Sequence, residues 1–281
     1  MQKNHFEEED PGVKDHATSP YESMYTHYVD AASRMTKFFG QNVSFPQKTR
    51  ILTLGIDIHT LLEVIAPANV ASSITTLLQT KEEKYNAVAA KHSLKSKNVK
   101  FSLRGPLEIS RKTELFDVVL ISAVLGNKRR YGDSKAILES LKSHMRHGAI
   151  IMIVEIDFGS FLFYPSSDEI AYVWSHNLRV MAEQGCDPRI GALVSPLLKE
   201  VGFRYIEVIH FFLDLNKTTP NERSDFIQQM VIEPLRTSWE MRVPTNSTDD
   251  SLFKKAIGDI NRTTLDNGSF YSTFTIVTGL R

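Results

Sequence analysis

Residues 116–125, reading FDVVLISAVL, place the strongest constraint on how this chain can fold. The run is almost continuously apolar, which is typical of a central strand of a parallel sheet with both faces buried. Asp133 can cap a following helix that continues to Met145. Gly148 closes this helix before a second strand at residues 149–155. Strand, helix and strand at this spacing make a βαβ unit, so the sequence predicts an α/β protein built on a parallel sheet.

Strand and helix patterns also alternate through the rest of the chain. Further strands are predicted at residues 51–54, 69–74, 99–103, 203–215 and 270–278. Further helices are predicted at residues 21–39, 80–92, 168–183, 222–241 and 251–265, and from the segment CDPRIG to residue 201. Residues 1–20 are acidic and polar and are expected to form a tail, whereas residues 21–281 are expected to form one domain.

The charge of the chain is balanced, with 33 Lys and Arg against 33 Asp and Glu. A neutral chain carries no electrostatic signature for nucleic acid or for an anionic membrane surface. No apolar run reaches the roughly 18 to 20 residues that span a bilayer. The single Cys186 cannot form an internal disulfide, and no Cys or His spacing indicates a metal. These features predict a cytoplasmic protein that binds neither nucleic acid nor membranes, with an apolar small molecule as its natural partner.

Four segments carry a family resemblance: LFDVVLISAVL, HGAIIMIVEID, GCDPRIGALVSPLLKEVGFRYIEV and the terminal YSTFTIVTGLR. Together they resemble the class I S-adenosylmethionine-dependent methyltransferases over roughly residues 21–281. The pairing of GCDPRIG with LLKEVGF is similar to the UbiE-like and LaeA-like enzymes that methylate small molecules in secondary metabolism. The resemblance implies a Rossmann-like fold with a seven-stranded, mostly parallel sheet. It also implies helical lid elements at about residues 21–40, 158–188 and 216–266.

In that family the cofactor S-adenosylmethionine is held at the carboxyl edge of the sheet. A glycine-rich loop follows the first strand, an acidic residue ends the second, and an Asp follows the third. In this chain the loop reads GIDIH, the second strand as predicted ends in ASSI without an acid, and the third leads into LRGPL. Gly55 and Asp57 are the remaining candidate cofactor contacts. We therefore expect no cofactor, or a weakened site for S-adenosylmethionine.

Four titratable residues are candidate catalytic groups. His59 would flank the methionine part of the cofactor and could act as a general acid or base; alternatively, it only begins the next helix. Glu155 and Asp157 share one face of a strand and could divide acid and base roles, or serve as a helix cap and a surface carboxylate. His176 would be the polar group within the aromatic lid.

The candidate substrate contacts are mostly aromatic. An aromatic lid suits a flat, apolar substrate, although aromatic residues at helical spacing also form ordinary core. A histidine in the predicted strand at residues 203–215 would line the same cavity, or would be a satisfied core residue. The candidate contacts are Tyr25, Tyr28, Ser122, Phe158, Tyr164, Trp174, Asn177 and His210.

Three functions remain open from the sequence. The first is a methyltransferase scaffold that catalyses a non-methylating step, such as a cyclisation, pericyclic reaction, dehydration or isomerisation, in natural-product metabolism. The second is a true O-, N- or C-methyltransferase with an atypical cofactor loop. The third is a non-catalytic subunit that pairs with an active methyltransferase-like or regulatory partner. As partners of the chain itself, we expect a second copy in a homodimer or a methyltransferase-like protein.

Overall fold

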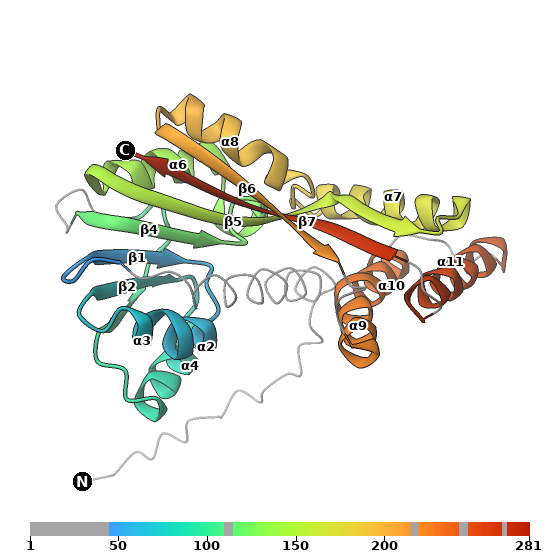
Figure 1. The fold of residues 1–281 in the computed structure, drawn as a ribbon, viewed down its shortest axis with the longest axis horizontal. Coiled ribbons are helices and arrows are strands. Elements are labelled where there is room, and N and C mark those ends of the chain that lie inside the picture. Colours follow the sequence, from blue (N-terminus) through green and yellow to red (C-terminus); the bar gives the residue numbers. More distant parts are fainter. Residues whose placement is uncertain (1–44, 110–114, 215–218, 242–246, 266–268) are drawn as a thin grey trace, which may run out of the picture.

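The computed structural model describes residues 45–109, 115–214, 219–241, 247–265 and 269–281, and its centre is a seven-stranded sheet (Figure 1). The strands lie in the order β3-β2-β1-β4-β5-β7-β6. β7 runs antiparallel to β5 and β6, and the other neighbouring strands are parallel. This topology confirms the predicted Rossmann-like, mostly parallel sheet. The predicted tail and the predicted helix at residues 21–39, with Tyr25 and Tyr28, lie outside the described residues.

Most elements lie where the sequence predicts them. The strands are β1 (Arg50–Leu54), β2 (Ser73–Leu78), β3 (Val99–Leu103), β4 (Phe116–Ser122), β5 (Met145–Tyr164), β6 (Arg204–Asp214) and β7 (Ser269–Leu280). The helices of the first half are α2 (Ile58–Thr60), the π-helical turn η1 (Leu61–Ile65), α3 (Ala66–Ala68), α4 (Lys81–Ser93), α5 (Lys128–Tyr131) and α6 (Ser134–Ser143). Those of the second half are α7 (Asp168–Glu183), α8 (Ile190–Val201), α9 (Pro220–Ile227), η3 (Gln228–Ile232), α10 (Glu233–Glu240) and α11 (Ser247–Leu265).

The βαβ unit of β4, α6 and β5 forms the middle of the molecule. β4 pairs in parallel with β1 on one side and β5 on the other, which explains its continuous apolar sequence. Asp133 caps α6 as predicted, because its Oδ1 accepts a hydrogen bond of 3.0 Å from the N–H of Ala136.

The end of α6 differs from the prediction. The helix ends at Ser143 rather than at Gly148, and the buried Met145 already belongs to β5, where it pairs with Phe116. The register between β4 and β5 then shifts, and Gly148 takes a φ of +78° within this irregularity. Gly148 therefore allows a bulge in the strand instead of closing the helix.

The position of β2 also differs from the prediction. Residues 69–72 form a turn, in which Asn69 Nδ2 donates to the carbonyl of Ile65 and the N–H of Ser72 donates to the carbonyl of Asn69. The strand begins only at Ser73 and continues to Leu78, so that Ile74 and Thr76 face inward. The predicted strand at residues 69–74 was wrong because apolar Val70 belongs to the surface turn, with 74% of its area exposed.

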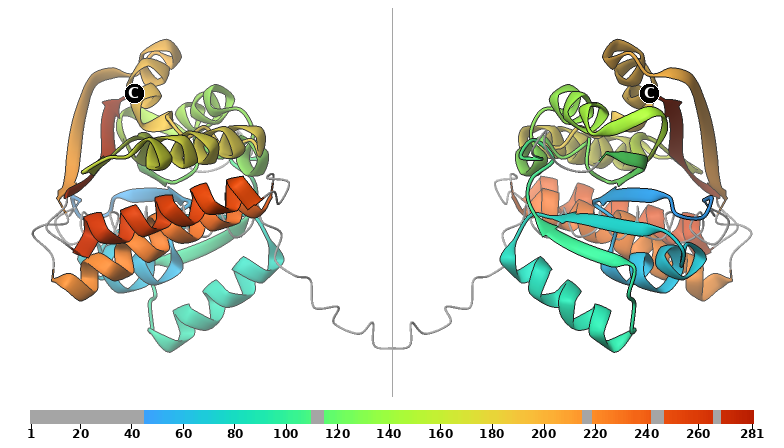
Figure 2. Two further views of the ribbon diagram at one scale, coloured as in Figure 1. Left: turned by 90° about the vertical axis from the view of Figure 1, so that its right-hand side faces the viewer. Right: turned by 90° about the vertical axis from the view of Figure 1, so that its left-hand side faces the viewer.

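Three apolar clusters hold the elements together. One lies between the sheet and the helices α6 and α8, and a second lies between β1, β2, β4 and the segment from η1 to α4. The third joins the far halves of β5 and β7 to α7, α10 and α11. Figure 2 shows α7, α10 and α11 side by side, and α7 contacts both other helices. Since β5 runs on to Tyr164, the predicted lid at residues 158–188 begins as strand and becomes helical at α7.

None of the described helices combines the length and the apolar character needed to traverse a bilayer.

Candidate functional site at the carboxyl edge of the sheet

Gly55 ends β1 at the carboxyl edge of the sheet, and its missing side chain has a structural reason. Its φ is +73°, and a Cβ atom built on it would lie 2.0 Å from the carbonyl oxygen of Ser122 and 2.5 Å from Cγ2 of Val124. The turn after β1 therefore contacts the turn after β4 directly, backbone against backbone. Ser122 itself is buried at the end of β4. Gly55 is required by this contact, whether or not a ligand binds.

The rest of the GIDIH segment begins a helix. Asp57 caps α2 by accepting a hydrogen bond of 2.7 Å from the N–H of Thr60, and Ile56 is buried in the core. The side chain of His59 is 67% exposed, and its Nδ1 lies 3.5 Å from Oε1 of Glu63. This position fits the alternative that His59 starts the next helix, so its catalytic role stays a prediction without structural support.

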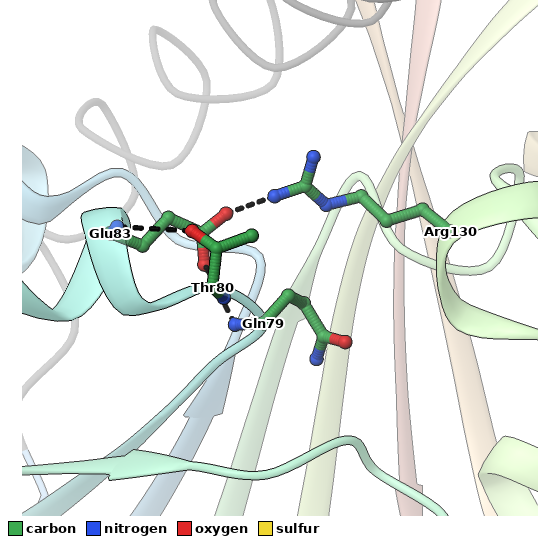
Figure 3. Close-up of polar contacts among 4 residues, drawn as sticks. All are labelled: Gln79, Thr80, Glu83 and Arg130. Atoms are coloured by element: carbon green, nitrogen blue, oxygen red, sulfur yellow. Dashed lines mark hydrogen bonds and ion pairs between the residues drawn. The ribbon is translucent and has the colours of Figure 1, made fainter. Parts of the chain in front are cut away.

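The end of β2 carries a compact polar network (Figure 3). Thr80 and Glu83 form a capping box at the start of α4: the N–H of Glu83 donates to Thr80 Oγ1, and the Glu83 carboxylate accepts from the N–H of Thr80. Oε2 of Glu83 also accepts from the N–H of Gln79 at 2.7 Å. Because β2 ends at Leu78, the residues after it are Gln79 and Thr80, and Glu83 is the carboxylate of this network.

Arg130, which comes from the other side of β1, joins this network by contacting Glu83. Its NH2 group donates to Oε1 of Glu83, and both side chains are largely shielded from solvent (Figure 3). Glu83 follows β2 and Arg130 follows β4, and β1 lies between those strands. Two strand spacings amount to about 10 Å, so the ion pair spans the carboxyl end of β1. Sequence reasoning missed both residues, because it placed the end of β2 too early and because no local pattern links residues 47 positions apart.

Glu155 stabilises the turn after β4 at the carboxyl edge of the sheet. The residue is fully buried on β5, and its Oε1 accepts hydrogen bonds from the N–H groups of Val124 at 2.9 Å and Leu125 at 2.8 Å. A carboxylate that accepts two backbone hydrogen bonds fixes the turn after β4 in one conformation. The structure supports neither the predicted helix cap nor direct exposure to a substrate.

Asp157 and His210, predicted as a catalytic and a substrate-binding residue, are brought together by tertiary structure. β7 lies between their strands: Thr275 pairs with His210 of β6 and with Glu155 of β5, two residues before Asp157, and Thr275 Oγ1 lies 3.3 Å from His210 Nδ1. Oδ1 of Asp157 is buried and has no hydrogen-bond partner. Gly191 of α8 packs on both Asp157 and Thr275, since a Cβ there would lie 3.0 Å from Asp157 Cβ. The result is a group of one carboxyl, one hydroxyl and one imidazole on adjacent strands.

Burial raises the pKa of Asp157 above its usual value of 3.8, against the opposing effects of backbone hydrogen bonds from Gly159 and Ser160 and the charges of Arg189 and His210. Burial thus favours the protonated carboxyl more in the folded protein than in the unfolded chain. Its stabilising contribution is complete below about pH 3.8 and is lost as the pH rises through the raised pKa.

We therefore expect Asp157→Asn to be at least as stable as the wild type at neutral pH, because the variant avoids a buried charge. The advantage should disappear in acid, where the carboxyl is protonated in both folded and unfolded chains. Thermal unfolding of both proteins across the acidic range measures this difference. Asp168→Asn, at an exposed position on α7, is the matched control. A stability difference between Asp157→Asn and the wild type that does not change with pH would contradict the assignment.

The aromatic lid candidates form core. Trp174 stacks on Phe161 with ring centroids 4.9 Å apart, and its Nε1 donates to the carbonyl of Phe158. His176 is buried against Trp239, at 5.2 Å between rings. These residues bind α7 to β5 and α10, as expected for aromatic residues at helical spacing.

His176, the two remaining candidates Asn177 and Tyr164, and the single cysteine occupy different environments. Arg179 NH2 lies 2.9 Å from His176 Nδ1, and since a guanidinium can only donate, the ring proton is on Nε2. Asn177 is buried, and its Oδ1 has no hydrogen-bond partner. Tyr164, at the end of β5, is 71% exposed. Burial raises the pKa of Cys186 to about 11, so this thiol is protonated at neutral pH and is a poor nucleophile.

No protein-family model matches the sequence, and no curated protein matches it. Solved structures do match in three dimensions. YcgJ from Bacillus subtilis aligns with a TM-score of 0.54 at 12% identity, over 88% of this chain and 98% of that one. The 4+2 cyclase SpnF aligns with a TM-score of 0.52 at 13% identity, over 90% of this chain and 81% of that one.

A third match identifies the architecture. Phosphoethanolamine N-methyltransferase 2 from Haemonchus contortus, solved with phosphomonomethylethanolamine and S-adenosylhomocysteine, aligns with a TM-score of 0.52 at 13% identity. The alignment covers 93% of this chain and 57% of the nematode enzyme, so the chain spans little more than half of that protein. This chain has the class I methyltransferase fold. The identity is too low to carry more than the fold.

The methyltransferase fold implies a site for S-adenosylmethionine, and the described residues do not fit that cofactor as they stand. Ribose hydroxyls donate hydrogen bonds and need a free carboxylate after β2. Here Glu83 is committed to the backbone of Gln79 and Thr80 and to Arg130. The side chain of Gln79 instead offers a buried amide nitrogen, Nε2, that has no hydrogen-bond partner. An amide can bond a ribose hydroxyl only as a neutral partner, without the charge-assisted hydrogen bond that a free carboxylate would accept.

Proposed function

We propose that this chain is an enzyme that uses the methyltransferase fold for a reaction other than methyl transfer. The Glu83–Arg130 ion pair carries the proposal, because it engages the carboxylate that is hydrogen-bonded to the backbone directly after β2, and because it spans the carboxyl end of β1. The fold is compatible with such chemistry, since the matched structure SpnF is a 4+2 cyclase.

The substrate proposed for the enzyme is an apolar small molecule of natural-product type. The contact of α7 and α10 with β5 consists of aliphatic and aromatic residues, among them Phe158 of β5, Trp174 of α7 and Trp239 of α10. A substrate between the lid helices and the edge of the sheet would meet an apolar surface with few polar groups.

Asp157 is the residue best suited to a proton-transfer step. Its carboxyl is half-buried, has an oxygen without a hydrogen-bond partner, and has a raised pKa, and each of these features favours a protonated acid that can donate and take back a proton. Isomerisation and dehydration each require such a group. Cyclisation or a pericyclic step would depend on substrate conformation instead, and Asp157 would not be needed.

Binding of the cofactor tests the first part of the proposal. Titration calorimetry with S-adenosylmethionine and S-adenosylhomocysteine should show no saturable binding to the wild type, because Glu83 is held by Arg130. Arg130→Ala should free Oε1 of Glu83. The affinity for S-adenosylmethionine should then rise on the order of tenfold, which is the effect of one charge-assisted hydrogen bond. Arg129→Ala, which removes a contact to Gln184, is the matched control and should change nothing.

Micromolar affinity of the wild type would favour the alternative, a methyltransferase with an atypical loop. That alternative has support from the Haemonchus contortus structure, which holds S-adenosylhomocysteine. The mass of the product separates the two functions. Incubation with metabolite extracts should convert a compound into one of equal mass or one lighter by water, without added cofactor. A cofactor-dependent gain of one methylene would show methyl transfer.

Asp157→Asn and Asp168→Asn distinguish the reaction types in the same assay. Loss of about two orders of magnitude in rate with Asp157→Asn alone would fit proton transfer. Unchanged rates would leave cyclisation as the reaction. If no compound is converted and the chain copurifies with a methyltransferase-like partner, it is a non-catalytic subunit. Analytical ultracentrifugation would then also show whether the chain forms the proposed homodimer.

A further inference from the structure

A groove at the amino edge of the sheet takes no part in the proposed reaction. It has a volume of about 290 Å³ and is lined by residues of η1, α3 and the turn that joins α4 to β3. Its floor is apolar: Leu62 and Ala66 are buried, and Val70 and Leu94 keep 74% and 42% of their area exposed. Exposed aliphatic side chains around an open groove favour a ligand with an apolar group.

The rim of this groove is basic. Lys95 and Lys97 line it and are exposed, and none of the lining residues is acidic. Neither lysine forms an ion pair with a described residue. The groove therefore suits an apolar side chain that is followed by negative charges.

We propose that the occupant is the chain's own N-terminal segment at residues 6–10, which reads FEEED. Phe6 would enter the apolar groove, and the four acidic residues after it would face Lys95 and Lys97. Within residues 1–44 this is the one run of consecutive acidic residues, and an aromatic residue directly precedes it.

The path of the chain supports this assignment. Phe45, the first described residue, donates its N–H to Oδ1 of Asn69 at 2.9 Å, and Asn69 adjoins the groove residue Val70. Asn98, which lines the groove, donates to the carbonyl of Asn69 at 3.0 Å. Residues 11–44 connect the acidic run to this point. This stretch of about 34 residues is long enough to let the acidic run return to the groove.

Zero-length carbodiimide cross-linking of the full chain tests the proposal. The reagent joins carboxylates to lysines in contact, and mass spectrometry should find residues 7–10 linked to Lys95 or Lys97. Exposed lysines outside the groove, Lys81 and Lys84 on the first turn of α4, should give few links. Links from Glu22 or Asp30 alone would place another segment in the groove, and equal links to all four lysines would show no docking. Either result would overturn the proposal.

Charge reversal in the full chain provides an independent test by hydrogen–deuterium exchange. Lys95→Glu with Lys97→Glu should speed exchange of residues 62–70 and 94–98 on the order of tenfold, because the docked state is lost. Reversal of residues 7–10 to Lys should have the same effect, and both reversals combined should restore slow exchange. Lys81→Glu with Lys84→Glu is the matched control and should change nothing. Exchange that is unaffected by either reversal, or not restored by the combination, would refute docking of this segment.

Discussion

Gly55→Ala is expected to lower the free energy of unfolding by about 3 to 5 kcal/mol. The added methyl group would meet the carbonyl oxygen of Ser122 at 2.0 Å, and the residue would keep a φ of +73° that alanine rarely adopts. Both the overlap and the backbone strain act on the same turn, and the two neighbouring strands cannot separate without breaking their ladder. Chemical denaturation of the wild type and the variant measures the loss.

Gly148→Ala is the matched control for this substitution. Gly148 has a similar φ of +78°, but nothing lies within 4 Å of the position of its Cβ. In this variant the free energy of unfolding should fall by only about 1 kcal/mol, because alanine is strained in the left-handed backbone conformation but meets no other atom. If both variants were equally stable, the close contact between the turns after β1 and β4 would be disproved. The glycine would then have to be explained by a ligand.

Glu155→Ala is expected to lower the free energy of unfolding by about 3 to 5 kcal/mol. The substitution removes the single oxygen that accepts from both Val124 and Leu125 and leaves two buried N–H groups without an acceptor. Thermal and denaturant unfolding of the purified variant test this expectation.

Glu155→Gln removes the charge of the side chain and keeps its shape. The amide oxygen can still accept both hydrogen bonds, so the free energy of unfolding should fall by about half as much as in the alanine variant. Glu63→Gln, at an exposed position, should have no comparable effect. A Glu155→Ala protein with unchanged stability would return Glu155 to the candidates for catalysis.

Both substitutions concern the same region, where the turns after β1 and β4 meet the middle of β5. In this fold that region usually faces a cofactor. Here a carbonyl fills the free side of Gly55, a buried carboxylate holds the turn after β4, and the Glu83–Arg130 pair spans the end of β1. The chain stabilises this edge with its own groups, which is the physical basis of the proposed loss of methyl transfer.

Much of the fold followed from local pattern. The continuous apolar run of β4 predicted a central strand, Asp133 predicted the start of α6, and the bounds of α7 were confirmed. These signals depend on residues near one another in sequence. Prediction failed where the same residue type is common in two kinds of local structure. Gly148 resembles a helix end but forms a bulge, and Val70 resembles a strand residue but is exposed in a turn.

Most of the candidate site could not be predicted. The contact of Thr275 with His210 and the position of Asp157 beside them join three strands, and the ion pair of Glu83 and Arg130 joins residues 47 positions apart. Nothing local in the sequence indicates such contacts. The roles of His59 and His176 stay predictions: the first lies on the surface and the second in the lid core.

The sequence by itself determined the class of fold, because alternating apolar strands and capped helices can bury their faces only in a layered α/β arrangement. It also determined that the glycine loop is incomplete, since that depends on residue identity alone. Only the tertiary structure decided what replaces the loop. The partners of Gly55, Glu83 and Glu155 come from strands that are neighbours in the sheet but distant in the chain, and burial fixes which of their polar groups must pair.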